Sequence, residues 1–498
     1  MLYSCSLMTP FTLQAQSSAQ KPNIIYIMCD DMGYGDLGCY GQQYISTPNL
    51  DRMASEGMLF TQAYAGSPVS APSRASFMTG QHTGHTYVRG NTEYRIGSTQ
   101  YGPTMESLQT GQEPYDTAHV IIPEIMKDNG YTTGLFGKWA GGYEGSISTP
   151  KTRGIDEFYG FICQFQAHAY YPNFLNEYSK TAGDADVHRV VLEENIPHAI
   201  YGNGYEKRKQ YSGDLIHQKA MNWLDKQTVH QPFLGIFTYT LPHAELYQPV
   251  DSILEAYKGF FCDEKKYGGS EGSRYNPTDC AHAQFAAMIT RLDTYVGQIL
   301  AKLKEKNLDK NTMVIFTSDN GPHEEGGADP DFFNRDGLLR GKKRSTYEGG
   351  IRVPFIVRWP GKIEAGVKND HQIAFYDIMP TFCDLIGVDD YLLKYKNSRV
   401  KTDYFDGISF APTLLGKNGQ KNHEYLYWEF SETNMLGLRM GNWKMVTNKG
   451  ICSLYDLAND IHEDKNVVTL YPEITKKMKA VIKDQHINSN RYHVTLPN

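Results

Sequence analysis

Short apolar runs alternate along the chain with longer stretches in which apolar residues recur at helical spacing. Residues 283–305 and 375–387 have the spacing of amphipathic helices, the second closed by Gly387. Five runs have the length and the β-branched or aromatic content of buried strands: "NIIYIM" (23–28), "TTGLF" (132–136), "FLGIFTY" (233–239), "MVIFT" (313–317) and "PFIVRW" (354–359). This alternation predicts an α/β fold in which a large, mostly parallel sheet is sandwiched by helices.

The pattern changes beyond about residue 420. The segments "EYLYWEF", "LGLRMGNWKMV" and "CSLYDL" predict antiparallel strands joined by turns, and a helix is expected at 472–485. We therefore expect a large α/β domain over 20–419, which would hold any functional site, followed by a small antiparallel α+β domain over 420–498. A chain of 498 residues has room for one large domain and one small one.

Residues 1–19 carry no charged side chain and end in small and polar residues. The Ala-Gln pairs at 15–16 and 19–20 resemble the ends of a cleaved export signal, but the basic segment that opens such signals is missing. Two interpretations stay open, a signal peptide or a disordered tail, and we expect an exported protein, periplasmic or secreted. No apolar run is long enough to predict a transmembrane anchor.

Charge and cysteine content exclude some classes of protein. A formal net charge of −7 argues against general binding of nucleic acid. Eight cysteines in a chain of this length do not form a disulfide scaffold. Cys262 and Cys280 bracket a Gly-rich loop, and either one disulfide or two unpaired thiols fits their spacing.

Polar residues follow four of the predicted strands within a few positions. They are Asp30 and Asp31, Lys138, His243, and Asp319 and Asn320. In open α/β sheets the ligand crevice lies outside the carboxyl ends of the strands, so these side chains should converge. The three carboxylates and one amide oxygen suit Ca²⁺ or Mg²⁺ rather than zinc. Each group alone also fits a cap or a turn, but together they favour a metal site.

The stretch "SPVSAPSRASFMTG" (67–80) predicts the start of a helix. Pro72 fits the first turn, Ser70 should lie at or just before the N-cap, and Gly80 can end the helix. Ser70 and Arg74 are four residues apart and so share a face. The first-turn N–H groups would then point at an anion held over Ser70. An ordinary capping serine is the other interpretation.

The same stretch resembles the signature of the type I sulfatases, which belong to the alkaline-phosphatase-like superfamily. In that pattern a Cys or Ser precedes X-Pro-X-Arg, and a maturation enzyme oxidises it to formylglycine. The resemblance extends over roughly residues 20–470, and the serine form of the signature is typical of bacterial enzymes. The motifs that carry it are "NIIYIMCDDMGYGDLGCYG", "TPNLDRMASEGMLFTQAYA", "GLFGKW", "LPH", "TSDNG", "LRGKKRSTYEGGIRVPFIVRWPG" and "DIMPTFCDLIG".

The resemblance implies a role for each candidate residue. Asp30, Asp31, Asp319 and Asn320 would bind Ca²⁺, with Mg²⁺ as the other choice. Ser70, as formylglycine hydrate, would attack sulfur in a two-step reaction, and Arg74 would stabilise it. Lys138, His243 and Lys343 would hold the sulfate oxygens, with His243 also protonating the leaving sugar oxygen. Lys342 and Arg344, beside Lys343 in the basic run 340–344, are expected to be exposed.

One position departs from the family pattern. The lysine is commonly followed by Trp-His, and here "GKWAGG" places Ala140 where that histidine, a candidate base for sulfate release, would stand. His82, His85 and His168 are conceivable substitutes, although each also fits a structural role. Trp139 is expected to pack in the core.

The resemblance implies an exo-acting carbohydrate sulfatase, with galactose or N-acetylgalactosamine as the guessed sugar. Its partners would be a sulfated saccharide and a serine-type maturation enzyme, with no nucleic acid. The loops offer His168, His323, Asp329 and Asn334 as sugar contacts, for each of which a structural role is equally open. Two alternatives remain. One is a phosphatase or phosphonate-ester hydrolase that uses unmodified Ser70, and the other is an inactive glycan-binding protein, motivated by Ala140.

Overall fold

The computed structural model describes residues 20–95, 110–197, 205–262, 266–268, 275–388 and 405–498. The expected signal peptide or tail at 1–19 lies outside the described residues. Within them, no helix combines the length and the apolar character that a bilayer-spanning segment needs.

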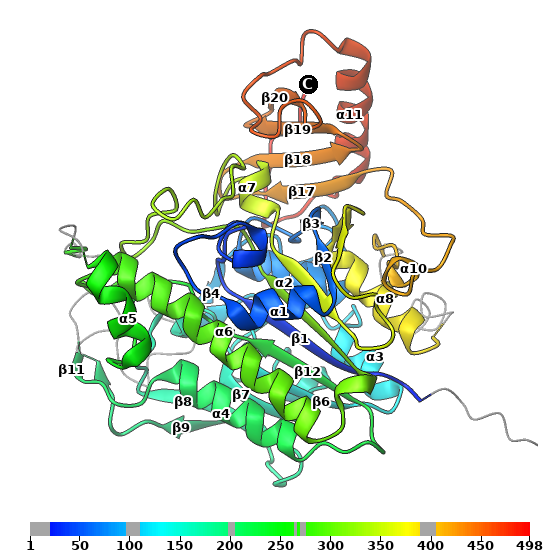
Figure 1. Ribbon diagram of the computed structural model, residues 1–498. Helices are drawn as coiled ribbons and strands as arrows, with labels where there is room; N and C mark the ends of the chain where they lie inside the picture. The colour runs from blue at the N-terminus through cyan, green and yellow to red at the C-terminus, as the bar shows by residue number, and fades with distance from the viewer. Residues whose placement is uncertain (1–19, 96–109, 198–204, 263–265, 269–274, 389–404) are drawn as a thin grey trace, which may run out of the picture.

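A ten-stranded sheet forms the centre of the larger part of the molecule (Figure 1). In spatial order its strands are β15 (Val367–Asn369), β2 (Met58–Phe60), β14 (Phe355–Arg358), β13 (Thr312–Ser318), β1 (Asn23–Cys29), β12 (Phe233–Thr238), β6 (Thr132–Lys138), β7 (Glu157–Phe161), β8 (Phe174–Ser179) and β9 (His188–Val191). All five predicted strands are present, and the run from β13 to β7 is parallel throughout.

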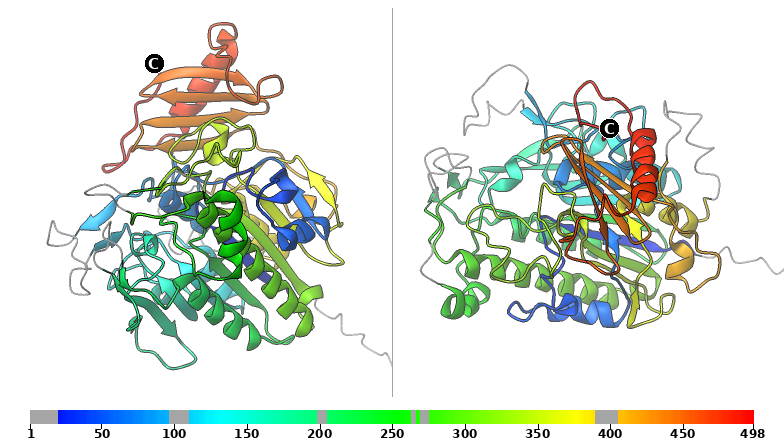
Figure 2. Two further views of the ribbon diagram at one scale, coloured as in Figure 1. Left: turned by 60° about the vertical axis from the view of Figure 1, so that its left-hand side comes forward. Right: turned by 90° about the horizontal axis from the view of Figure 1, so that it is seen from above.

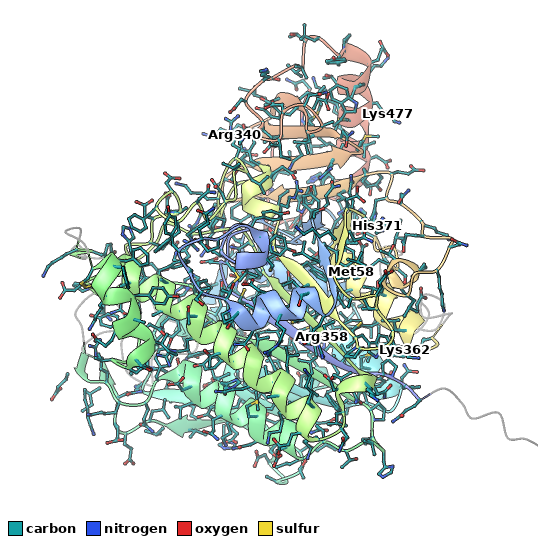
Figure 3. The ribbon with its side chains drawn as sticks, in the orientation of Figure 1. Met58, Arg340, Arg358, Lys362, His371 and Lys477 are labelled. Atoms are coloured by element: carbon teal, nitrogen blue, oxygen red, sulfur yellow. A yellow bond between two sulfur atoms is a disulfide. The ribbon has the colours of Figure 1, made fainter. Side chains whose placement is uncertain are left out.

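Antiparallel pairs flank this parallel run on both sides, and the edge strand β15 is parallel to β2. β14 runs against β13 and β2, and β8 runs against β7 and β9. Arg358 of β14, labelled in Figure 3, is held by ion pairs with Glu56 (2.6 Å) and Asp309 (2.7 Å). An apolar run such as 354–359 predicts a buried strand but carries no information about its direction.

Helices cover both faces of the sheet, as predicted. One apolar core joins the sheet to helices in front of it in Figure 1, which are α1 (Pro48–Ser55), α4 (Ser212–Asp225), α5 (Ser252–Phe261) and α6 (Ala281–Glu305). The core on the other face includes α2 (Ser70–Thr79), α3 (Ile122–Asp128), α8 (Ile378–Leu385) and α10 (Ala411–Leu414). Smaller elements are α7 (Glu348–Ile351) and the strand pairs β3 (Ala63–Tyr64) with β16 (Ile373–Ala374), β4 (Glu93–Arg95) with β5 (Thr110–Gln112), and β10 (Ile196–Pro197) with β11 (Tyr205–Lys207).

The C-terminal part forms a separate layer above the large sheet (Figure 2). Its antiparallel strands are β17 (Leu426–Phe430), β18 (Met435–Met440), β19 (Trp443–Asn448) and β20 (Ile451–Asp456), and they pack against α11 (Pro472–Gln485). Trp428 Nε1 donates a hydrogen bond to the Ala65 carbonyl (2.8 Å), and Lys444 Nζ donates to Glu348 (2.7 Å). These buried contacts fix the small sheet on the large part of the molecule. The domain boundary at residue 420 stays a prediction.

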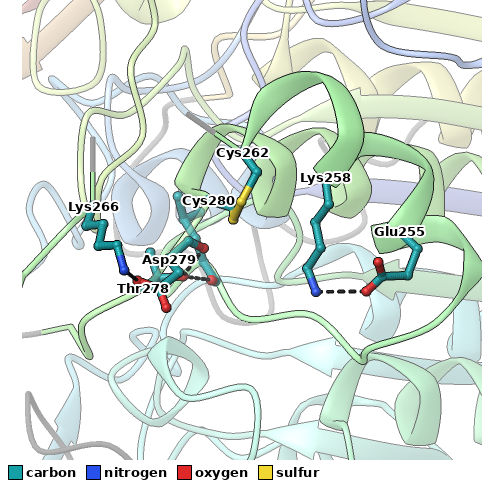
Figure 4. Close-up of a disulfide and its surroundings, with 8 residues drawn as sticks. Glu255, Lys258, Cys262, Lys266, Thr278, Asp279 and Cys280 are labelled. Atoms are coloured by element: carbon teal, nitrogen blue, oxygen red, sulfur yellow. Dashed lines mark hydrogen bonds and ion pairs between the residues drawn. A yellow bond between two sulfur atoms is a disulfide. The ribbon is translucent and has the colours of Figure 1, made fainter. Parts of the chain in front are cut away.

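Cys262 and Cys280 are joined by a disulfide, which decides between the two alternatives left open by the sequence. The bond connects the residue after α5 to the residue before α6 (Figure 4). It therefore ties together two helices on the same face of the sheet.

Candidate active site

The carboxyl ends of the central strands bring the predicted polar residues to one edge of the sheet. Asp30 and Asp31 follow β1, and Lys138 is the last residue of β6. The Asp31 amide donates to Asp319 Oδ1 (3.1 Å), which links the ends of β1 and β13. All of these side chains are buried, so their charges interact in a medium less polar than water.

Ser70 is the first residue of α2, and every residue of this helix is buried. The expectation that Ser70 lies at or just before the N-cap is wrong, because Val69, with an extended backbone, occupies the N-cap. Gly80 ends the helix at a φ of 69°, as predicted, because glycine adopts the left-handed conformation without strain. The Ser70 hydroxyl donates to Asp30 Oδ1 at 2.9 Å. Ser70 therefore lies directly beside the carboxylates that follow β1.

We expected the first-turn amides of α2 to point at an anion held over Ser70. Those that follow Ser70 instead have partners within the protein, or none to offer. The Ala71 amide donates to Asn91 Oδ1 (3.1 Å), Pro72 has no N–H, and the Ser73 amide donates to the Val69 carbonyl (3.3 Å). Positive charge near Ser70 is instead supplied by side chains.

Arg74 and Lys138 surround Asp30. Arg74 donates from Nε and Nη2 to Asp319 Oδ2 (3.0 and 2.8 Å), and Nη2 lies 3.5 Å from Asp30 Oδ2. Lys138 Nζ donates to the same Asp30 oxygen. Burial by itself would raise the pKa of Asp30, but the neighbouring positive charges, above all that of Lys138, hold this pKa well below its usual range. Asp30 is therefore a carboxylate.

The predicted metal ligands form a set made only of oxygen donors. Asn320 Nδ2 donates to Asp31 Oδ1 (2.7 Å) and to the Gly321 carbonyl (2.9 Å). Asn320 Oδ1 is buried and, among the described residues, accepts no hydrogen bond. Buried polar atoms are normally satisfied, and a cation is one partner that would satisfy this one. The carboxylates and this amide oxygen fit a hard divalent ion.

Lys343 reaches the same place from the loop before α7. Its Nζ donates to Asp31 Oδ2 (2.8 Å) and lies 3.0 Å from His243 Nε2 and 3.2 Å from Glu325 Oε2. Burial opposes the charge of Lys343, but Asp31 and then Glu325 raise its pKa above the usual value. Lys343 is therefore a buried ammonium.

The two residues that flank Lys343 in the sequence differ in their exposure to solvent. Lys342 is exposed, as predicted. Arg344 is partly exposed, with 39% of its side chain accessible, and it donates to Glu325 Oε1 (2.6 Å).

A cavity of about 400 Å³ opens over Ser70. Ser70, Lys138, His243 and Lys343 all line it, so the cavity holds a hydroxyl together with two buried lysines and an imidazole. The other lining residues are Asn91, Thr92, Glu93, Gln164, His168, Glu325, Arg344 and Glu432. Among them, Glu93 and Gln164 add a carboxylate and an amide, which are hydrogen-bonding partners for sugar hydroxyl groups.

The four expected sugar contacts do not come together. His168 lines the cavity and stacks on His243, with ring centroids 4.6 Å apart. His323 is buried on the other side of His243, where its Nε2 lies 3.1 Å from the Pro242 carbonyl. Asp329 and Asn334 are not among the lining residues. The role of all four in sugar binding stays a prediction.

Ala140 is fully buried and adopts a φ of 54°. Trp139 beside it is buried, as expected, and its Nε1 donates to the Ser148 carbonyl (3.1 Å). His85 Nδ1 lies 2.8 Å from Asp406 Oδ1, and the His82 amide also donates to Asp406 (2.9 Å). Of the three histidines considered as substitutes, His168 alone is among the residues that line the cavity.

Several lining residues were missed from the sequence. Glu325 lies two residues beyond His323, and the sequence did single out the loop that contains both residues. Asn91 and Glu432 come from a loop before β4 and from the turn between β17 and β18. Neither position stands out in a local pattern, because the contacts that bring them to Ser70 are long-range.

Comparison with known proteins identifies the family. The sulfatase family model matches residues 22–388, and a model described as N-sulphoglucosamine sulphohydrolase, C-terminal, matches residues 341–488. An N-acetylgalactosamine-6-O-sulfatase of Bacteroides thetaiotaomicron is 29% identical, over 94% of this chain and 93% of its own length. The N-acetylgalactosamine-6-sulfatase of Canis lupus familiaris is 31% identical, over 87% of this chain and 73% of its own length.

A solved structure agrees with these relatives. The crystal structure of Ps i-CgsB in complex with k-i-k-neocarrahexaose matches with a TM-score of 0.71 and 26% identity, covering 96% of each chain. The family match spans the whole large sheet together with Ser70 and its surrounding charges. The chain belongs to the sulfatase family and is a sulfuric ester hydrolase.

Proposed function

We propose that this protein is an exo-acting carbohydrate sulfatase that removes a sulfate ester from a terminal sugar, with galactose or N-acetylgalactosamine as the sugar. The reaction uses formylglycine, which a serine-type maturation enzyme generates from Ser70. Ca²⁺, or Mg²⁺ in its place, is held by Asp30, Asp31, Asp319 and Asn320.

The observation that carries this proposal is the pairing of Ser70 with buried lysines in one cavity. Ser70 contacts Asp30, and Lys138 and Lys343 line the same cavity together with His243. A sulfate ester is an anion, and further negative charge develops on its leaving oxygen during transfer. Fixed positive groups in a buried site stabilise such charge, which is usually the largest contribution to catalysis.

Each residue of the site has its own role in the proposed reaction. Lys138 and Lys343 donate hydrogen bonds to the sulfate oxygens, and Arg74 holds residue 70 and Asp319 in place. His243 delivers a proton to the leaving sugar oxygen, because a sugar alkoxide is a poor leaving group. Formylglycine hydrate attacks sulfur through one hydroxyl, which loses its proton to solvent as the bond between sulfur and the sugar oxygen breaks. The second hydroxyl then loses its proton to water, the C–O bond to sulfate breaks, and the aldehyde re-forms and adds water to regenerate the hydrate. Ca²⁺ held by the four oxygen ligands would supply neutralisation of negative charge at the site.

The sugar preference is supported by the names of the relatives. Two of them are sulfatases of N-acetylgalactosamine-6-sulfate esters, and the solved relative binds a neocarrahexaose. Glu93 and Gln164 in the cavity wall give hydroxyl-rich substrates hydrogen-bonding partners. The Cys262–Cys280 disulfide favours an oxidising compartment and so supports export to the periplasm or the medium.

Mass spectrometry of the peptide that contains residue 70 tests the proposal. In protein produced with a maturation enzyme we expect loss of two hydrogens at Ser70, together with release of sulfate from 6-sulfated N-acetylgalactosamine. Turnover should vanish in Ser70→Ala and persist in Ser431→Ala, a serine of the C-terminal sheet outside the cavity. An unmodified serine in active protein would instead support the phosphatase or phosphonate-ester hydrolase alternative.

The alternative of a glycan-binding protein is motivated by Ala140. It predicts affinity for sulfated sugar without turnover, even when residue 70 carries the modification. Calorimetric titration of Ser70→Ala with the sulfated sugar, beside the turnover assay, separates the two functions.

A further inference from the structure

Asn91 connects the first turn of α2 to the C-terminal sheet through two hydrogen bonds. Asn91 Oδ1 accepts from the Ala71 amide (3.1 Å), which directly follows Ser70 in the chain. The backbone N–H of Asn91 donates to Glu432 Oε1 (2.6 Å), on the turn between β17 and β18. A side chain 341 residues further along the chain than Asn91 is thereby linked to the backbone next to the reacting residue.

The loop around Asn91 is also held by other contacts with the C-terminal part. Arg89 Nη1 donates to Glu429 Oε1 (2.8 Å) and to the Ile487 carbonyl (2.6 Å), and Arg89 and Glu429 are buried. Gly90 lies so close to Tyr492 that an added Cβ would come within 2.9 Å of its ring. This loop therefore has little freedom to move independently of the C-terminal sheet.

The first turn of α2 depends on this outside acceptor. The first amides of a helix have no intrahelical partner and are usually satisfied by the N-cap side chain. The N-cap residue here is Val69, whose side chain offers no acceptor. Asn91 supplies the missing acceptor from a different segment, at the residue next to Ser70. Fixing this turn matters because small displacements of a reacting group lower the rate steeply.

We propose that Asn91 and Glu432 are positioning residues through which the C-terminal sheet holds residue 70 in its reactive geometry. This inference rests on the proposed function, in which residue 70 supplies the nucleophile. The C-terminal sheet would then raise the rate of the chemical step by keeping residue 70 in place.

Steady-state kinetics on modified enzyme separate positioning from substrate binding. Asn91→Ala should lower kcat by at least about tenfold with little change in KM, because the acceptor for Ala71 is lost. Asn91→Asp keeps an acceptor but adds a negative charge to the cavity, so it should mainly raise the KM for an anionic ester. Glu432→Ala should lower kcat, whereas Glu432→Gln, which keeps an accepting oxygen, should retain the kcat of the wild-type enzyme.

The matched control is Asn434→Gly on the same turn. Asn434 accepts from the Thr495 amide (2.7 Å) and has a φ of 54°, which glycine adopts readily. This variant should keep the kcat of the wild-type enzyme. The formylglycine content of every variant is measured first, so that a difference in maturation is not mistaken for a difference in rate.

Hydrogen exchange gives a second measurement that does not need turnover. The Ala71 amide should exchange at least about tenfold faster in Asn91→Ala and in Glu432→Ala than in the wild type or in Asn434→Gly. Unchanged exchange in Glu432→Ala, or a change in KM alone for Asn91→Ala, would overturn the positioning role. If the wild type hydrolyses no sulfated sugar, the proposed function fails, and the exchange rates still decide whether the link holds α2.

Discussion

Nε2 of His243 lies 3.0 Å from Nζ of Lys343. The Lys343 ammonium can only donate, so Nε2 accepts, and Nδ1 carries the proton that faces the Ala244 carbonyl. Burial and then the charge of Lys343 lower the pKa of His243. A cation and a neutral imidazole thus lie side by side in the cavity wall. For His243 to act as the acid, its Nε2 must first take a proton from the Lys343 ammonium that donates to it. Substitutions that remove the two residues should therefore have different consequences.

Substitution of His243 should depend on the leaving group of the substrate. For a sugar sulfate, His243→Ala should lower kcat by about 10²- to 10⁴-fold, because the alkoxide leaves without a proton. For an aryl sulfate, whose phenolate needs no proton, the loss should be much smaller. Lys343→Ala serves for comparison and should impair both substrates, since its ammonium contacts the sulfate itself. Equal losses for His243→Ala on both substrates would rule out its role as the acid.

Removal of the metal should abolish activity and lower stability. Chelation leaves the buried carboxylates of Asp30, Asp31 and Asp319 without their cation, and a Ca²⁺ concentration of 100 times Kd should restore about 2.7 kcal/mol of unfolding free energy. Elemental analysis and thermal unfolding with and without chelator measure both effects. Asp319→Asn should lose the response to Ca²⁺, whereas Asp225→Asn, at the end of α4, should keep it. A protein that binds no divalent ion would refute the assignment.

Buried His217 should make the protein sensitive to acid. It lies 2.7 Å from both the Tyr239 hydroxyl and Gln298 Oε1, and burial lowers its pKa from 6.5 to about 4. The unfolded chain therefore binds a proton below about pH 6.5 that the folded protein does not bind until about pH 4. Stability should fall across this interval, by up to about 3 kcal/mol from this residue.

Urea unfolding at pH 7 and pH 4.5 tests the role of His217. His217→Gln should lose this part of the pH dependence, and His230→Gln, an exposed histidine, should retain it. If the difference in unfolding free energy between the wild type and His217→Gln is the same at both pH values, the prediction is wrong.

Removal of the disulfide should destabilise the protein. Cys262 and Cys280 are 18 residues apart, and a loop of this size is worth about 3 kcal/mol when closed by a disulfide. The double replacement of both cysteines by serine should lower Tm, whereas Cys452→Ser, at a free cysteine, should have a much smaller effect. Thermal unfolding of the wild type, the double variant and Cys452→Ser tests this prediction. An unchanged Tm in the double variant would contradict it.

The sequence predicted the parts of the site that follow from strand order. Asp30, Lys138 and Asp319 come at the ends of strong apolar runs, and parallel strands must deliver such residues to one edge. Lys343 was different, because it lies on a loop and only the resemblance to sulfatases singled it out. The spacing of Ser70, Pro72 and Arg74 identified the helix, but Val69 provides no local signal for where that helix begins.

The remaining features depend on tertiary contacts that leave no periodic pattern. The apolar character of 354–359 reflects burial on both faces, which is the same for either strand direction. Arg344 belongs to a basic run that resembles a solvated surface, and its contact with Glu325 is decided by how two loops fold together. Asn91 and Glu432 meet only because the C-terminal sheet packs above α2.

The complete burial of α2 has a consequence for the proposed modification of residue 70. Ser70 is 3% exposed and Arg74 2%, so the folded protein offers no access to this segment for an enzyme that binds it as an extended peptide. Under the proposed function, oxidation of Ser70 would therefore have to precede the folding of α2. A molecule that folds first would keep an ordinary serine, and the proportion of active molecules would depend on the relative rates of oxidation and folding.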